Sequence, residues 1–166
     1  MSPEKRESRL SDILRFFVSI IICQLAGIIG AFFTSASVSS WYVTLNKPSF
    51  TPPEWLFAPV WTSLYFLMSI SLFLVWRKYK CEKQAGEALK IFMIQLLLNI
   101  LWSLAFFGME APLSGLVIII ILLIFILITI VKFYNISKSA AILLIPYFLW
   151  VCYASVLNFY LWRLNI

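Results

Sequence analysis

The stretch PLSGLVIIIILLIFILITIV, residues 112–131, contains no Lys, Arg, Asp or Glu. About 20 residues of helix cover the ~30 Å of hydrocarbon in a bilayer, and a helix satisfies its own backbone polar groups, as a chain in lipid must. The side chains are apolar on every face, so no stripe points to a partner or a pocket. We therefore predict a transmembrane helix over residues 113–131 whose surface mostly faces lipid.

Four further apolar runs have a similar length. They cover residues 16–35, 57–76, 91–107 and 140–162, and none contains a charged side chain. The chain of 166 residues is 63% hydrophobic and 12% charged, an excess of apolar residues that a soluble core of this size cannot bury. The first run follows basic residues, as a signal peptide would, but at about 18 apolar residues it is too long for a typical signal and should be retained. We predict an all-α, integral membrane bundle of five transmembrane helices, forming a single domain over residues 1–166.

The basic residues are concentrated in the predicted loops on one side of the membrane. Eleven of the thirteen lie in the N-terminal segment or in the loops after the second and fourth runs, namely Lys5, Arg6, Arg9, Arg15, Arg77, Lys78, Lys80, Lys83, Lys90, Lys132 and Lys138. The positive-inside rule then places the N-terminus in the cytoplasm and the C-terminus outside. So strong a bias favours a bacterial plasma membrane, with a mitochondrial outer membrane as the alternative. It also explains the net charge of +6 without nucleic acid as a partner.

The sequence offers no residues for ordinary metal or hydrolytic chemistry. It has no histidine, and its three cysteines are far apart, with Cys23 and Cys152 in apolar runs and Cys81 in a charged loop. Histidine is the commonest metal ligand and general base, and closely spaced cysteines are the usual alternative ligands. We expect no metal site, no bound cofactor and no nucleophile–base pair.

A polar and aromatic stripe runs along the predicted helix 91–107. It consists of Gln95, Asn99, Trp102, Ser103 and Phe106, which recur at helical spacing. Amides are costly in lipid, so Gln95 and Asn99 should face the interior of the bundle. Two interpretations remain open: hydrogen bonding between helices alone, or the lining of a ligand cavity.

The run 140–162 repeats this pattern. Trp150, Ala154 and Asn158 lie four residues apart on one face, with Tyr147 and Tyr153 beside them. These side chains should also face the interior of the bundle.

Proline and small residues shape the other helices. Pro146 frees the carbonyl group of Ile142 and should kink its helix, opening space beside the aromatic rings. Trp61 and Tyr65 are four residues apart, although Trp61 could equally be an interfacial tryptophan. In the first run, Gly27, Gly30, Ala31 and Thr34 lie close together, and such residues let another helix approach closely, either inside the bundle or in a homodimer.

The segment WYVTLNKPSFTPPEWLFAPVW, residues 41–61, holds four of the seven prolines and three of the seven tryptophans. Proline restricts its own φ and the conformation of the preceding residue, so this segment is stiff and costs little entropy to order. Its aromatic side chains give the segment a large apolar surface. We predict a lid over residues 36–56, folded across the outer mouth of the bundle.

Three long patterns resemble one known family. They are W-Y-x-x-L-x-K-P-x-x-x-P-P-x-x-x-F-x-P-V-W from residue 41, Q-L-x-L-N-x-x-W-S-x-x-F-F from residue 95, and P-Y-x-x-W-x-x-Y-A-x-x-L-N from residue 146. They are similar to the TspO/MBR family, which includes tryptophan-rich sensory proteins and the mitochondrial translocator protein, or peripheral-type benzodiazepine receptor. The resemblance covers about residues 16–163.

The resemblance implies a pocket beneath the first loop. Family members bind porphyrins such as protoporphyrin IX, synthetic ligands of the benzodiazepine-receptor type and in some cases cholesterol, and many behave as dimers. The matching positions imply pocket residues Tyr42, Pro52, Trp61, Tyr65, Asn99, Trp102, Trp150 and Ala154. Indole and phenol rings can stack on a flat porphyrin. Tyr147 lies beside these rings, and Lys47 in the lid could meet the propionates.

Three functions are consistent with this resemblance. The first is a membrane receptor or sensor for tetrapyrroles. The second is an enzyme that degrades porphyrin with light and oxygen, in which Trp61 and Trp150 would be the redox-active catalytic residues. The third is a porphyrin or sterol transporter, for which Leu157, Tyr160 and Arg163 fit a weak sterol pattern, L-x-x-Y-x-x-R.

Overall fold

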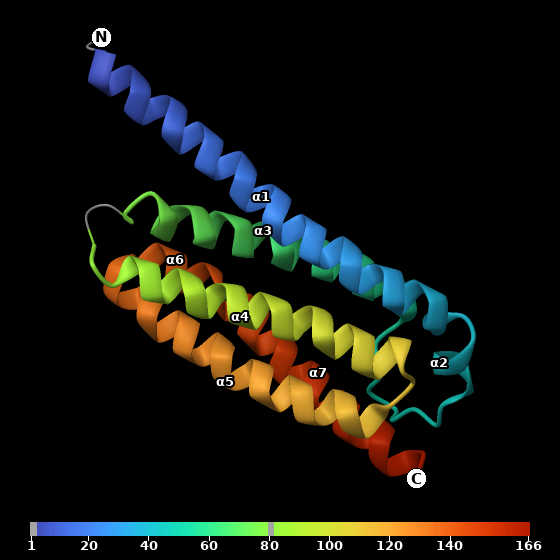
Figure 1. Ribbon diagram of the computed structural model, residues 1–166. Coiled ribbons are helices and arrows are strands. Elements are labelled where there is room, and N and C mark those ends of the chain that lie inside the picture. The colour runs from blue at the N-terminus through green and yellow to red at the C-terminus, as the bar shows by residue number, and fades with distance from the viewer. Residues whose placement is uncertain (1–2, 80–81) are drawn as a thin grey trace.

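The computed structural model describes residues 3–79 and 82–166. Five helical segments are long and apolar enough to cross a membrane, and the described residues contain no strand (Figure 1). They are α1 (Pro3–Val38), α3 (Phe57–Trp76), α4 (Ala85–Ser103), α5 (Pro112–Ile136), and α6 (Lys138–Leu143) together with α7 (Ile145–Leu164). The predicted all-α integral membrane bundle of five transmembrane helices is confirmed.

Helix boundaries differ from the prediction where polar residues continue a helix beyond the apolar run. The predicted helix 16–35 is part of a helix that begins at Pro3, and the predicted helix 91–107 begins at Ala85. Hydropathy marks only the part of a helix that lies in hydrocarbon, so it misses these extensions. At its other end α4 continues as a π-helical turn, η2 (Leu104–Gly108), closed by a 2.8 Å hydrogen bond from the Met109 N–H to the Leu104 carbonyl oxygen.

The predicted helix 140–162 is interrupted rather than merely kinked, which corrects the prediction. Leu144 separates α6 from α7, and Pro146 lies in the first turn of α7, where its missing N–H costs no hydrogen bond. Extended backbone at Ser137, with φ −154° and ψ 106°, separates α5 from α6. α5 is therefore the fourth crossing of the bundle, and α6 and α7 together form the fifth.

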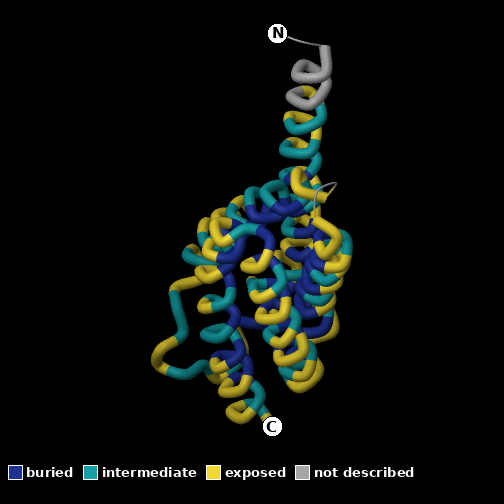
Figure 2. Tube along the Cα trace, turned by 90° about the vertical axis from the view of Figure 1, so that its left-hand side faces the viewer, coloured by how far each residue is buried: buried dark blue, intermediate teal, exposed yellow. Residues whose placement is uncertain are grey.

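The helices close into a ring. α1 packs on α3 and α4, α4 packs on α5, α5 packs on α7, and α6 closes against α3. Buried residues lie on the inner faces and exposed residues on the outer faces (Figure 2). The core includes Met68, Phe92 and Phe133, and the last two rings stack at 5.6 Å with an interplanar angle of 7°. The outer faces carry exposed Leu, Ile and Val side chains, as contact with lipid requires.

Residues 39–56 join α1 to α3 and are called the lid below. They contain the short helix α2 (Trp41–Thr44), an extended proline-rich segment and a 3₁₀ turn, η1 (Glu54–Leu56). The lid begins later than predicted, because α1 extends to Val38. Figure 1 shows this connection at one end of the bundle, which we call the lid end. We call the opposite end the basic end, because most Lys and Arg residues of the sequence belong to the segments that lie there.

Candidate ligand cavity

A cavity of about 390 Å³ lies between α1, α3 and α4, beneath α2. This volume falls in the range of small-molecule sites, roughly 300–1,000 Å³. Buried side chains form its inner wall, among them Tyr42, Tyr65, Asn99, Trp102, Ser103 and Phe107. The wall is thus largely aromatic, with a few polar atoms.

The rim of the cavity lies on two neighbouring helices. Ala31 and Ser35 of α1 and Ala58 and Thr62 of α3 line the cavity and are exposed. All four lie within or next to the membrane-spanning parts of their helices. The cavity therefore opens sideways between α1 and α3, near the lid end.

Small residues of α1 allow this arrangement. A Cβ atom at Gly27 would lie 2.7 Å from Cδ2 of Tyr65, and one at Gly30 would lie 3.2 Å from Oγ of Ser103. The two glycines therefore serve close packing inside the bundle, the first of the two alternatives left open by the sequence. The homodimer stays a prediction.

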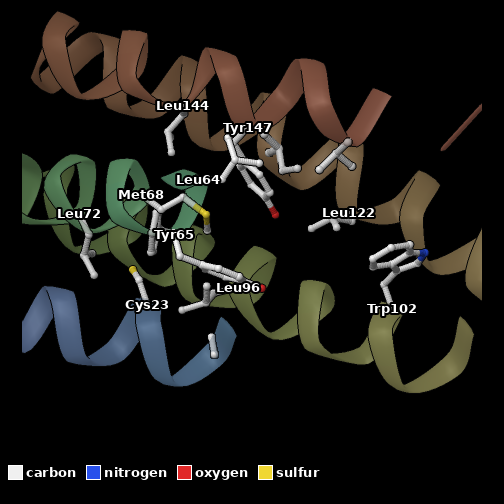
Figure 3. Close-up of a cluster of buried hydrophobic side chains, with 14 of the residues drawn as sticks. Cys23, Leu64, Tyr65, Met68, Leu72, Leu96, Trp102, Leu122, Leu144 and Tyr147 are labelled. Atoms are coloured by element: carbon white, nitrogen blue, oxygen red, sulfur yellow. The ribbon is translucent and has the colours of Figure 1, made fainter. Parts of the chain in front are cut away.

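A hydrogen-bonded chain joins three helices at the inner end of the cavity. The Tyr65 hydroxyl donates to Oδ1 of Asn99 at 2.7 Å, and Nδ2 of Asn99 donates to the Tyr147 hydroxyl at 2.9 Å. All three residues are buried. Figure 3 shows the rings of Tyr65 and Tyr147 extending from two different helices into the space between them. Asn99 thus ties α3 to α7 through α4.

A second amide holds Trp102. Its indole Nε1 donates to Oδ1 of Asn158 at 3.1 Å, and Nδ2 of Asn158 donates to the Pro112 carbonyl oxygen at 2.8 Å. The indole N–H is therefore satisfied without a ligand, which leaves the ring to form the apolar wall of the cavity.

Trp61 is the centre of an aromatic cluster. Its ring centroid lies 5.7 Å from that of Tyr65, 6.1 Å from Trp102 and 6.4 Å from Tyr147. These distances are typical of favourable ring pairs. The rings of the second, third and fifth membrane segments converge, as the spacing of these residues indicated.

The lid is fastened to α7 at two points. The Tyr153 hydroxyl donates to the Phe50 carbonyl oxygen at 2.7 Å. The Asn46 N–H donates to Oδ1 of Asn165 at 2.8 Å, and Nδ2 of Asn165 donates back to the Asn46 carbonyl oxygen at 3.0 Å. Proline supplies stiffness, and these bonds supply the position.

Within the lid, a charged pair lies over Tyr42. Nζ of Lys47 is 3.3 Å from Oε1 of Glu54 and 4.1 Å from the centroid of the Tyr42 ring. The Tyr42 side chain is buried, and its hydroxyl has no hydrogen-bond partner among the described residues. Burial, and then the negative charge of Glu54, raises the pKa of Tyr42 to about 12. At neutral pH this phenol is a hydrogen-bond donor on the cavity wall.

The structure brings together about half of the predicted site residues. Tyr42, Trp61, Tyr65, Asn99 and Trp102 line the cavity. Tyr147 is one step behind this wall, bonded to Asn99 and packed against Trp61.

The other predicted residues do not line the cavity. Trp150 packs on Phe57 at 6.2 Å and on Tyr153 at 5.6 Å, and Ala154 packs against the core. Lys47 and Pro52 lie in the lid, where Lys47 is paired with Glu54.

The residues of the sterol pattern do not share one face. Leu157 is buried, whereas Tyr160 and Arg163 are exposed, and the Tyr160 ring packs on Phe50 of the lid. A sterol on the outside of α7 could therefore contact only two of the three.

The sequence interpretation missed the contribution of α1. Gly27, Gly30, Ala31 and Thr34 line the cavity, although their small size was taken only as a sign of helix contact. Gln24, which no pattern singled out, lines it as well. Gln95, in contrast, does not line the cavity, although it belongs to the predicted stripe. Both of its side-chain polar atoms are buried without a partner in the part of the chain that the structure describes.

A lid-covered, aromatic cavity inside a five-helix membrane bundle defines a class of membrane ligand-binding protein. The model of the TspO/MBR family matches residues 19–163, and the chain belongs to this family. It is 47% identical over 154 residues to the tryptophan-rich protein TspO of Archaeoglobus fulgidus, covering 93% of this chain and 99% of that protein. It is 38% identical to the tryptophan-rich sensory protein of Cereibacter sphaeroides, covering 75% and 77% of the two chains. It is 35% identical to the translocator protein of Homo sapiens, covering 82% of each.

Proposed function

We propose that this chain is a membrane receptor or sensor that binds a flat, hydrophobic tetrapyrrole such as protoporphyrin IX in the cavity beneath the lid. The observation that carries the proposal is the pair Trp61 and Trp102 on the cavity wall, with ring centroids 6.1 Å apart and planes inclined by 34°. Aromatic pairs contribute about 0.5–1.5 kcal/mol each beyond the area that they bury. The names of the relatives, sensory protein and translocator protein, support a role in sensing or handling a ligand.

The position of the opening suits a ligand that dissolves in the membrane. The rim between Ala31 and Thr62 is exposed at the level of the spanning helices, so such a ligand can reach the cavity while the lid stays fastened to α7. The distribution of Lys and Arg suggests that the lid end faces away from the cytoplasm. A bacterial plasma membrane is the location that we propose.

The polar edge of such a ligand would lie near the lid. The unpaired hydroxyl of Tyr42 can donate to a carboxylate, and Nζ of Lys47 lies over the same ring. Glu54, which lines the cavity, already neutralises Lys47. A porphyrin propionate would therefore have to displace Glu54 from Lys47, or be protonated, or remain in water at the mouth.

Quenching of tryptophan fluorescence by protoporphyrin IX tests the proposal on the full chain in detergent or nanodiscs. Saturable quenching is expected, and Trp61→Phe should weaken the affinity because it replaces a ring of the cavity wall. Trp76→Phe is the matched control, since Trp76 lies at the far end of α3, and it should lower the total fluorescence without changing the Kd. Non-saturable quenching, or equal Kd values for the two variants, contradicts the proposal.

Porphyrin degradation is the second candidate, because Trp61 contacts three other oxidisable rings. In this function Trp61 and Trp150 would relay electrons between the porphyrin and oxygen under light. Illumination should then give a defined product that is lost in Trp61→Phe/Trp150→Phe. The product mixture of free porphyrin bleaching would contradict it.

Ion-coupled transport is less favoured. No Asp, Glu, Lys or Arg is buried in the described segments of the chain, whereas carriers driven by ions usually keep ionisable groups within the membrane.

A further inference from the structure

A second groove lies between α1 and α3 at the basic end, where the two helices diverge toward the N-terminus (Figure 1). Its lining is Asp12, Ile13, Phe16, Phe17, Phe73 and Arg77. It shares no residue with the ligand cavity. This groove combines an apolar wall with a charged lip.

The wall contains three aromatic rings, of which Phe17 is exposed and Phe16 and Phe73 are half-buried. Phe16 and Phe73 pack edge to face at 5.4 Å, and Phe17 packs on Phe16 at 5.7 Å. Phe17 and Ile13 remain 57% and 54% exposed, although both lie in the membrane-spanning part of α1. In a bilayer the material that covers such a wall is a lipid acyl chain.

The lip consists of Asp12 and Arg77, with Arg15 beside them, and among the side chains that the structure describes these three charges leave an excess of one positive charge. Nη1 of Arg15 and Nη2 of Arg77 lie 3.1 Å and 3.4 Å from the two carboxylate oxygens of Asp12. Each guanidinium keeps further N–H donors, because Arg has five. About half of the Arg77 side chain is exposed, at 49%, so its donors can reach a second anion.

The position of the lip matches the headgroup layer. Arg77 directly follows the last residue of α3, which is 20 residues long, so its backbone lies where the spanning helix ends. Arginine matches phosphate oxygens in a two-pronged geometry and binds them more specifically than lysine does. The groove therefore offers contacts for a lipid headgroup at its lip and for an acyl chain along its apolar wall.

We propose that this groove binds one acidic phospholipid, with the phosphate on Arg77 and Arg15 and an acyl chain along Phe16, Phe17 and Phe73. The site is independent of the lid cavity and of its ligand. Zwitterionic lipids offer the same chains and a phosphate but no net charge, so the excess positive charge of the lip favours phosphatidylglycerol over phosphatidylcholine. The preference expected from one basic residue at a membrane surface is on the order of fivefold.

Native mass spectrometry of the full chain tests this, with phosphatidylglycerol and phosphatidylcholine of identical chains in competition. The unsubstituted chain should retain one phosphatidylglycerol in preference, and Arg77→Gln should abolish the preference. The matched control Lys138→Gln removes a positive charge from α6, outside the groove, and should keep it. Equal retention of the two lipids, or equal behaviour of the two variants, overturns the proposal.

Two further measurements distinguish binding of the acyl chain from binding of the phosphate alone. Phe17→Ala removes an exposed ring without opening the core, so it should lower the retention of both lipids and leave the thermal unfolding midpoint unchanged. It replaces Arg77→Gln as the decisive variant if the latter does not fold. Displacement of the lipid by glycerol 3-phosphate, which has no acyl chain, would identify a site for soluble anions and overturn the lipid assignment.

Discussion

Asn165 at the end of α7 pairs with both backbone polar groups of Asn46 in the lid, accepting from its N–H at 2.8 Å and donating to its carbonyl oxygen at 3.0 Å. Nδ2 of Asn165 also reaches the Leu161 carbonyl oxygen at 2.8 Å, which fixes the amide in place. One side chain thus joins positions 46 and 165 across most of the chain length. The lid is therefore attached to the residue that caps the last helix, in addition to its bond from Tyr153.

The substitution Asn165→Ala should loosen the lid without unfolding the bundle. The bonds are exposed, and each is worth about 0.5–1.5 kcal/mol, so amide exchange at Asn46 should accelerate by roughly tenfold, the ratio that 1.4 kcal/mol gives. Hydrogen exchange followed by mass spectrometry measures this directly. Asn135→Ala, an exposed asparagine on α5 at the basic end, is the control. Exchange at Asn46 that stays the same would show that proline stiffness alone positions the lid.

Gly27→Ala should disturb the inner wall of the cavity. The added Cβ would lie 2.7 Å from Cδ2 of the Tyr65 ring, so the ring has to move and the 2.7 Å bond from its hydroxyl to Asn99 is strained. Overpacking of this kind costs about 1–3 kcal/mol. The thermal unfolding midpoint should fall and ligand affinity should weaken.

Gly86→Ala provides the comparison for this prediction. Its Cβ would lie 3.2 Å from Cε2 of Tyr79, an exposed ring that can swing away. Alanine is also the better helix former, by up to about 1 kcal/mol in a helix interior and by less in the first turn, where Gly86 lies. Gly86→Ala should leave the thermal unfolding midpoint unchanged or raise it slightly, whereas Gly27→Ala should lower it. Equal changes in the two variants would contradict the steric explanation.

Asn99 and Gln95 are buried amides one helical turn apart, and their replacement by leucine should have opposite effects on stability. Asn99→Leu leaves the hydroxyls of Tyr65 and Tyr147 without their partner, and unpaired buried polar groups cost about 1–3 kcal/mol each. Gln95→Leu instead removes an amide whose two polar atoms have no partner among the described residues, so it should be neutral or stabilising. Equilibrium unfolding in mixed micelles compares the two variants. A loss of stability for Gln95→Leu as large as that for Asn99→Leu would show that Gln95 has a partner, such as a buried water.

The sequence predicts the spanning helices well, because bilayer thickness fixes their length and hydrocarbon excludes charge. It also predicts the inward stripe of Asn99 and Trp102, since amides are costly in lipid. It does not predict which inward residues share a cavity. Trp150 and Ala154 were predicted to line it, yet Trp150 packs beside Phe57 and Ala154 against the core, because the cavity lies between α1, α3 and α4 and no residue of α7 lines it.

The role of α1 shows a second limit of sequence patterns. Small residues four apart indicate that another helix approaches closely. In α1, however, Gly27 packs against a neighbouring helix, whereas Ala31 lies at the open rim of the cavity. The difference depends on the side chain of the facing helix, which at Gly27 is Tyr65. The hydrogen bonds between Asn46 and Asn165 cannot be predicted from the local sequence, because the two residues meet only once the bundle has folded.

Alkaline pH should destabilise the lid through Tyr42. Its pKa rises from 10.0 to about 12 in the folded chain, first through burial and then through the negative charge of Glu54. The folded state therefore holds the phenol proton more tightly than the unfolded state does. The resulting stability is fully present below pH 10 and is lost as the pH rises from 10 to 12, with a maximum of roughly 2–3 kcal/mol at 1.36 kcal/mol per pH unit.

Tyr42→Phe isolates this contribution, because phenylalanine keeps the ring and has no proton to lose. The difference in unfolding free energy between Tyr42→Phe and the unsubstituted chain should be constant up to pH 10 and then shift in favour of the variant. Tyr134→Phe, at an exposed tyrosine on α5, should follow the unsubstituted chain throughout. A difference that does not change between pH 9 and pH 11.5 would mean that the Tyr42 hydroxyl reaches solvent and that α2 does not bury it against the bundle.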